Sequence, residues 1–206
     1  MNKKIDNKRV GFHSIESIIK NNPHKIKKLI IPQSREDKRI INLIDLAEKN
    51  GIKYQVSKKL KQEPEAEILN DNNLSFQDLK IFLEDQSNEK LNLLILDNII
   101  DPRNLGAILR TAAVLNIDGI IINKDHCAPT TDTVHRVSCG GSDLLNIFYV
   151  SNLLNCIKTL KEFNFEIIGF TEHAKDGLQQ IRDGNSALVF GSEEKGIRVK
   201  LSLIHI

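Results

Sequence analysis

The stretch LDNIIDPRNLGAILRTAAVLNIDGIII, residues 96–122, decides the fold of this chain. It overlaps the end of the apolar run LNLLILD, residues 91–97, and contains most of a second run, IDGIIIN, residues 117–123. Two continuous apolar runs, separated by a polar loop and a helical pattern, are typical of buried parallel strands joined by a crossover helix. We therefore expect an α/β protein with a parallel sheet that begins near residue 91.

The same alternation continues along the chain. Strands are predicted at IFYV, FEIIGF and SALVFG, and helices at TDTVHRVSCGGSDL, residues 131–144, where Gly140-Gly141 ends the helix, and at SNLLNCIKTLKEF. Alternating strands and helices predict a doubly wound sheet. Ligands bind to such sheets at the carboxyl ends of the strands, so the site is expected just after Leu96, Ile122, Phe170 and Phe190.

The rest of the chain divides into two further segments. Residues 1–61 contain a small α/β unit, in which residues 36–49 have helical spacing and KIKKLIIP reads as a strand. Residues 62–90 hold 8 acidic and 2 basic residues with several turn-forming groups, so they are predicted to be a linker with a short helix near 75–84. Residues 91–206 form the third segment.

The net charge of +2 is the sum of a positively charged front segment and a negatively charged remainder. Residues 1–61 carry 16 Lys and Arg against 6 Asp and Glu, whereas residues 62–206 carry 13 against 21. A basic front end on an acidic body favours a domain that contacts a polyanion such as RNA. A solvated basic surface is the alternative.

Several common sites are excluded by their missing residues. No GxGxxG follows a strand, and the Gly191 to Gly196 turn lacks the Lys-Ser/Thr of a phosphate-binding loop. No HExxH or Cys/His cluster occurs, so no metal site is expected. The three cysteines form no CxxC, and no apolar run is long enough to cross a membrane. We expect a cytoplasmic protein with reduced thiols.

The loop and helix within residues 96–122 hold the residues best placed for chemistry. Asn104 is predicted to cap the helix, and Gly106 permits another backbone to approach closely. Arg110 follows in the early turns, where its guanidinium can hold a phosphate with two hydrogen bonds. The alternative is an ordinary capped helix with one exposed arginine.

Two motifs of this chain resemble those of the SpoU/TrmH family of RNA ribose 2′-O-methyltransferases. LDNIIDPRNLGAILRTA resembles the first motif of that family, and LVFGSEEKGIR, residues 188–198, resembles the second. GFHSIESIIK, residues 11–20, followed by KIKKLIIP and REDKR, resembles the amino-terminal L30e-like domain of the branch that methylates guanosine in 23S rRNA.

The resemblance implies a SPOUT-type fold with helices on both faces of the sheet, a carboxyl-terminal trefoil knot and a homodimer. It also implies methyl transfer from S-adenosyl-L-methionine to a ribose 2′-hydroxyl. The family's catalytic positions fall on Asn104, Arg110 and Glu193, and its donor-binding positions on Thr171, Gly191, Gly196 and Ile206. Since arginine rarely gives up its proton, positioning and charge stabilisation are the roles we expect of Arg110.

The basic front domain fits the same interpretation. Six side chains are expected to follow RNA phosphates: Lys25, Lys27, Lys28, Arg35, Lys38 and Arg39. Their alternative is a solvated helix face and loop. The low aromatic content, 5%, argues against extensive base stacking, so a folded rRNA is the expected partner.

Family members continue past the second motif to a third, an Ile-Pro strand end followed by a Ser-Leu-Asn turn. Here the sequence after the second motif reads KLSLIHI, residues 200–206, so we expect an incomplete donor pocket and knot. Residues 62–75 also lack the His-Gln-Gly stretch of many relatives. Two alternatives to the rRNA enzyme therefore stay open: a non-catalytic RNA-binding remnant and a tRNA 2′-O-methyltransferase.

Overall fold

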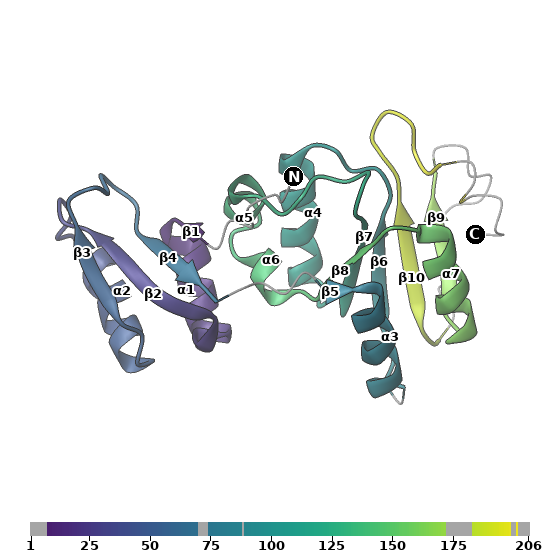
Figure 1. The fold of residues 1–206 in the computed structure, drawn as a ribbon, viewed down its shortest axis with the longest axis horizontal. Helices are drawn as coiled ribbons and strands as arrows, with labels where there is room; N and C mark the ends of the chain where they lie inside the picture. Colours follow the sequence, from purple (N-terminus) through teal and green to yellow (C-terminus); the bar gives the residue numbers. More distant parts are fainter. Residues whose placement is uncertain (1–7, 70–73, 88, 172–182, 199–200, 202–206) are drawn as a thin grey trace. The chain divides into compact units, whose positions relative to one another are not determined.

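The computed structural model describes residues 8–69, 74–87, 89–171, 183–198 and 201 (Figure 1). The chain divides into two compact units. The first comprises Met1–Asn72, Gly106–Ala113 and Thr130–Leu144, and the second comprises Asn73–Leu105, Val114–Pro129 and Leu145–Ile206. No described helix is long and apolar enough to cross a membrane.

The first unit contains a four-stranded sheet in the order β1-β4-β2-β3. Its strands β1, β4 and β2 are antiparallel, and β3 pairs parallel to β2. Phe12, Ile15 and Ile19 of one helix and Ile40 and Leu43 of another bury their side chains in its core. The elements of this sheet and its helices are β1 (Lys8–Val10), α1 (Phe12–Asn21), η1 (Pro23–Lys25), β2 (Ile26–Pro32), α2 (Lys38–Lys49), β3 (Tyr54–Ser57) and β4 (Glu65–Ile68).

Helix α2 occupies most of the stretch predicted to be helical, residues 36–49, but begins two residues later. Asp37 is its N-cap, and the carboxylate of Asp37 accepts hydrogen bonds from the backbone N–H groups of Arg39 and Ile40. A capping carboxylate satisfies amides that have no partner inside the helix.

The second unit is built on a six-stranded sheet in the order β5-β8-β7-β6-β10-β9. Every neighbouring pair in it is parallel. Its elements are β5 (Leu74–Ser75), α3 (Phe76–Asp85), β6 (Asn92–Leu96), β7 (Gly119–Asn123), β8 (Ile147–Val150), α7 (Leu153–Glu162), β9 (Glu166–Phe170) and β10 (Ser186–Phe190). The expected α/β fold with a parallel sheet is confirmed.

Helices α3 and α7 cover one face of this sheet. The core cluster there joins Leu93 and Ile95 of β6 to Leu83 of α3 and to Ile157 and Leu160 of α7. Helix α4 (Pro102–Val114) makes the connection from β6 to β7, and most of it, Gly106–Ala113, groups with the first unit.

Residues 62–90, predicted to be a linker, contain three regular elements. β4 belongs to the first sheet, where Ala66 and Ile68 are buried, while β5 and α3 belong to the second unit. The helix expected near 75–84 corresponds to α3, which begins with a capping box between Ser75 and Asp78. The polar composition concealed a short strand because only alternate residues of β4 are buried.

The helix predicted over residues 131–144 is wrong in its extent. The structure has two short helices there, α5 (Asp132–Val137) and α6 (Gly141–Leu144). Between them, Cys139 and Gly140 have φ angles of 52° and 90°, which a right-handed helix does not allow. Cys139 and Gly140 separate the two helices, and Gly141 is the first residue of α6. The expected incomplete knot concerns residues 199–206, of which the structure describes only Leu201.

Candidate active site

The carboxyl ends of the parallel strands carry the polar residues of the second unit. Asp97 follows β6, Asn123 ends β7, Ser151 follows β8, Thr171 follows β9 and Gly191 follows β10. Adjacent parallel strands bring these ends to one edge of the sheet. This is the edge at which the sequence predicted a site.

Asp97 anchors the turn that follows β10. Its carboxylate is buried, and its Oδ1 accepts hydrogen bonds from Nε and Nη2 of Arg198 at 2.8 and 2.7 Å. The backbone N–H of Arg198 donates to Oδ2 of Asp97 at 3.0 Å. The sequence analysis did not single out this pair. The sequence did contain a signal for it, because Asp97 is a charged residue that directly follows a run of apolar residues.

The turn itself is closed by its own backbone. Ser192 and Gly196 exchange two hydrogen bonds, with N···O distances of 3.1 and 2.8 Å. A Cβ added to Gly191 would overlap the carbonyl group of Gly196 and the nitrogen of Ile197. Gly196 has a φ of 60° and open space around its Cα. Gly191 is therefore needed to build the turn, independently of any ligand, whereas Gly196 takes a left-handed conformation that glycine adopts most easily.

Helix α4 begins earlier than the sequence suggested. Asp101 precedes it, and its Oδ1 accepts a hydrogen bond from the backbone N–H of Arg103 at 2.7 Å. Pro102 is the first helical residue, a position where its missing N–H costs nothing. Asn104 is consequently in the first turn and is not the N-cap. Its exposed side chain is left to make other contacts.

Asn104 makes such a contact with the turn after β10. Its Nδ2 donates a hydrogen bond to Oε2 of Glu193 at 3.3 Å. Both side chains are exposed to solvent. The structure thus brings together one predicted catalytic residue from each of the two motifs, 89 residues apart in the sequence.

Arg110 lies six residues further along α4, in the stretch that groups with the first unit. It is exposed and makes no hydrogen bond or ion pair with the described part of the chain. Gly106, one turn earlier, allows the close approach predicted for it. A Cβ there would lie 2.7 Å from Cβ of Val137 and 3.0 Å from the carbonyl oxygen of Val134, both in α5.

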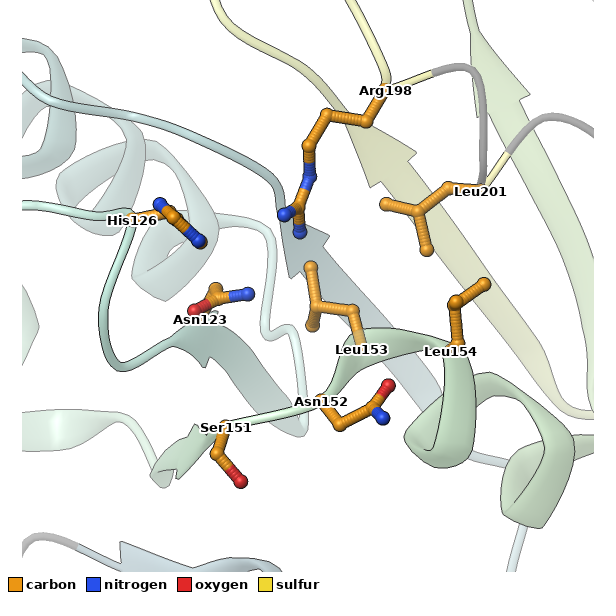
Figure 2. A pocket seen from close by; sticks show the side chains of 8 residues that line it. All are labelled: Asn123, His126, Ser151, Asn152, Leu153, Leu154, Arg198 and Leu201. Atoms are coloured by element: carbon orange, nitrogen blue, oxygen red, sulfur yellow. The ribbon is translucent and has the colours of Figure 1, made fainter.

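A cavity of about 430 Å³ opens beside the ends of β7 and β8 (Figure 2). The side chain of Arg198 extends from the turn into it, above Leu153. Asn123, His126 and Asn152 supply polar groups to its wall. The sequence analysis did not identify this cavity.

One more predicted donor-binding position lies at β9, the edge strand of the sheet. Thr171 is exposed and directly follows β9. Phe170 and Phe190, paired across β9 and β10, stack with ring centroids 4.4 Å apart and 9° between the rings. They form an apolar surface beside Thr171 and Gly191. Ile206 lies outside the described residues.

The six basic residues predicted to bind RNA fall into two groups. On and beside β2, Nζ of Lys25 donates to the carbonyl oxygen of Asp143 and Lys27 pairs with Glu67, so these two are partly engaged within the protein. Near α2, the guanidinium groups of Arg35 and Arg39 lie 4.8 and 4.4 Å from the ring centre of Phe12. Lys28 and Lys38 make no such contacts with the described residues.

Among the described residues, no three His, Cys, Asp or Glu side chains lie together in a way that could hold a metal ion. The side chains at this edge include the amide of Asn104, the carboxylate of Glu193 and the guanidinium of Arg198 around a tight backbone turn. These groups can orient and stabilise a charged substrate.

Two family models match the chain. The SpoU rRNA methylase family matches residues 92–203, and the model described as RNA 2′-O ribose methyltransferase substrate binding matches residues 10–61. These two matches include every described element except β1, β4, β5 and α3.

Curated relatives agree with these models. The 23S rRNA (guanosine-2′-O-)-methyltransferase RlmB of Shewanella oneidensis is 34% identical over 197 residues, covering 91% of this chain and 80% of that protein. The protein of the same name from Escherichia coli is 30% identical, and the match covers 91% of this chain and 81% of that protein.

Solved structures show the same fold. The SpoU methyltransferase AviRb of Streptomyces viridochromogenes, in complex with the cofactor AdoMet, superposes with a TM-score of 0.72 at 18% identity, covering 96% of this chain and 77% of that one. An AdoMet-bound rRNA methyltransferase from Sinorhizobium meliloti gives 0.69 at 17% identity, covering 96% and 75%. On the family model and the curated relatives, this chain belongs to the SpoU rRNA methylase family.

Proposed function

We propose that this chain transfers a methyl group from S-adenosyl-L-methionine to the ribose 2′-hydroxyl of a guanosine in 23S rRNA. The observation that carries the proposal is the hydrogen bond between Asn104 and Glu193, which joins the two motifs of the family at the carboxyl edge of the sheet. The names of the curated relatives favour 23S rRNA over the tRNA alternative.

The residues at the edge of the sheet fit the methyl donor. The stacked rings of Phe170 and Phe190 offer an apolar surface next to the turn at Gly191, and an adenosine has apolar faces to place there. Backbone groups at the turn and the hydroxyl of Thr171 supply polar partners along the same edge. When bound, the donor supplies an electrophilic methyl group on a sulfonium.

The chain's own residues act on the RNA side of the reaction. A ribose hydroxyl is a weak nucleophile, so it must be oriented and its developing charge stabilised. Arg110, exposed and unpaired with the described residues, is the group we assign to hold a phosphate and stabilise that charge. Asn104 orients the ribose, and Glu193 holds the amide of Asn104 in one direction.

We assign RNA binding to the small sheet and its helices, within residues 1–61, and catalysis to residues 91–206. We further propose that the chain works as a homodimer in the cytoplasm, as the family resemblance implies. Light scattering of the purified chain tests the dimer directly.

A methyl-transfer assay tests the function. Radiolabelled S-adenosyl-L-methionine is incubated with the purified chain and either 23S rRNA or tRNA transcripts, and the labelled nucleotide is identified after digestion. We expect 2′-O-methylguanosine in 23S rRNA only, and loss of at least about 100-fold in rate for Arg110→Ala, a loss typical of removing a charge-stabilising group.

Glu194→Gln is the matched control, since Glu194 is an exposed carboxylate in the same turn. If the label appears in tRNA alone, the substrate is tRNA rather than 23S rRNA. Absence of methyl transfer, together with no heat of binding when S-adenosyl-L-methionine is titrated into the chain, would identify the non-catalytic alternative instead.

A further inference from the structure

A second cavity, also of about 430 Å³, opens on the surface of the first unit. On one side it is lined by residues of α1 spaced three and four apart, which share one face of that helix: His13, Glu16, Ser17, Lys20 and Asn21. Arg110 of α4 and Cys139 complete the lining. All of these residues belong to the first unit. We refer to it as the α1–α4 cavity.

The pair Gly140-Gly141 builds this cavity by letting two helices approach one loop. A Cβ on Gly140 would lie 2.6 Å from Cβ of Ser17 in α1. One on Gly141 would lie 3.0 Å from the carbonyl oxygen of Leu109 and 3.1 Å from Cα of Arg110 in α4. Any side chain at these positions would push α1 or α4 away, so the spacing of the cavity walls depends on the two glycines.

A buried ion pair holds the same loop in place. Nε and Nη2 of Arg9 each lie 2.9 Å from Oδ1 of Asp143 in α6, and both side chains are almost completely buried. Nζ of Lys25 donates to the carbonyl oxygen of Asp143 at 3.0 Å. The α1–α4 cavity is therefore bounded by a fixed wall rather than by a loose loop.

The charge lining the cavity is positive. Lys20 and Arg110 are exposed and unpaired with the described residues. The single acidic residue of the lining, Glu16, lies 3.7 Å from Nε of Arg39, which offsets its charge. Nη2 of Arg39 also lies 3.2 Å from Nε2 of His13. Among the described residues that line the cavity, Lys20 and Arg110 are unpaired cations, and the one carboxylate, that of Glu16, is paired with Arg39.

We propose that the α1–α4 cavity binds a phosphodiester group of the RNA substrate, held between Lys20 and Arg110. Arginine binds phosphate with two parallel hydrogen bonds, and lysine adds a mobile point charge. The proposal rests on the proposed function, because RNA is the polyanion that the family model covering α1 assigns to this part of the chain.

The salt dependence of RNA binding tests this proposal. Binding of a fluorescein-labelled RNA hairpin is measured by anisotropy at several salt concentrations for the full chain, Lys20→Ala and Lys20→Arg. Loss of one phosphate contact lowers the slope of log K against log salt by about 1. We expect that decrease for Lys20→Ala and a restored slope for Lys20→Arg. Lys158→Ala, which removes an exposed lysine of α7 outside the residues assigned to RNA binding, is the control.

Cys139 gives an independent readout inside the cavity. It is an exposed free thiol, whereas Cys127 is half-buried and Cys156 is buried. Bound RNA hairpin should slow maleimide labelling of Cys139 at least about fivefold, as expected for a group covered by ligand at saturation. Inorganic phosphate at the same concentration of phosphate groups should leave the labelling rate of Cys139 unchanged.

Two results would overturn the proposal while leaving the proposed function intact, provided that the original chain binds RNA. One is a salt slope for Lys20→Ala equal to that of the original chain. The other is a rate of Cys139 labelling that bound RNA does not change. Protection by inorganic phosphate alone would identify a free-anion pocket and count against an RNA site. Failure of the original chain to bind any RNA would overturn the proposed function itself.

Discussion

Asp97 and Arg198 stand 101 residues apart in the sequence, yet three hydrogen bonds join them, two from the guanidinium and one from the backbone N–H of Arg198. The carboxylate is fully buried, whereas 41% of the Arg198 side chain stays exposed. A buried charge needs partners of this kind to offset its lost hydration. The pair therefore ties the end of β6 to the turn that carries Glu193.

Removing the carboxylate of this pair should loosen the turn. For Asp97→Ala we expect the free energy of unfolding to fall by about 2–3 kcal/mol, the range for hydrogen bonds to a charged group. The half-exposed Arg198 can be rehydrated, which keeps the loss below that of a fully buried pair. Urea denaturation measures this change in the free energy of unfolding. Glu194→Gln, in the same turn, should stay within about 0.5 kcal/mol; equal losses in both variants would contradict the assignment.

The two glycines of the turn should respond differently to substitution. Gly191→Ala places a Cβ on the backbone of Gly196 and Ile197, so the turn must open and S-adenosyl-L-methionine binding should be lost. A Cβ at Gly196 would have no neighbouring atom within 4 Å, and asparagine tolerates a positive φ, so Gly196→Asn should retain binding. Calorimetric titration compares the two variants. Retained binding in Gly191→Ala would show that the turn does not shape the donor site.

The buried ion pair Arg9–Asp143 should contribute far more to the stability of the fold than the neighbouring exposed pair Lys8–Glu65. Arg9→Met leaves a buried carboxylate uncompensated and should lower the free energy of unfolding by about 3–5 kcal/mol. Lys8→Met removes a partner that is 52% exposed and should cost less than about 1 kcal/mol.

The double variant Arg9→Met with Asp143→Leu gives the internal check. Replacing both charges by apolar groups should recover most of the stability, because no unpaired charge remains. If the double variant is less stable than Arg9→Met, hydrogen bonding by Asp143 to other groups outweighs its pairing with Arg9.

The cysteines should react with alkylating agents in the order of their burial. Burial raises the pKa of the Cys156 thiol to about 12, and burial also raises the pKa of Cys127. The thiolate is the reacting form, so at pH 9 Cys139 should be labelled first, Cys127 more slowly and Cys156 only after unfolding. Mass spectrometry of peptides from a time course follows each site.

The raised pKa of Cys156 also predicts how stability changes at alkaline pH. The unfolded thiol ionises before the folded one, so its contribution is present below the ordinary pKa of 9.0 and is lost as the pH rises toward 12. Cys156→Ala, measured from pH 8 to pH 11, should lose less stability over this range than the original chain. Identical slopes would show that Cys156 is not the group responsible.

The contact between Asn104 and Glu193 should affect catalysis more than stability. Both side chains are exposed, so Asn104→Ala should change the free energy of unfolding by less than about 0.5 kcal/mol. We expect its rate of methyl transfer to fall about 10- to 100-fold, since a misplaced substrate loses orientation. Glu193→Gln keeps an oxygen that accepts the same hydrogen bond, so it should retain more activity than Glu193→Ala.

The parallel sheet was predictable because its strands are buried on both faces. The uninterrupted apolar stretches Leu93–Leu96 and Ile120–Ile122 lie in two adjacent central strands and are buried throughout. β4 was missed for the opposite reason: in EAEI only Ala66 and Ile68 are buried, and the glutamates between them resemble a linker. The break at Cys139 and Gly140 depends on packing against α1, which local pattern does not contain.

The sequence by itself determined the family, the order of the strands of the second unit from residue 91 onward and the positions of Asn104, Arg110 and Glu193, because each depends on neighbours close along the chain. The tertiary structure alone decided that Asp97 meets Arg198, that Asn104 meets Glu193, and that Lys20 and Arg110 line one cavity. Each of those pairs is separated by about 90 residues or more. Such contacts arise from crossover connections and helix packing, which bring distant segments together with no local signal in either one.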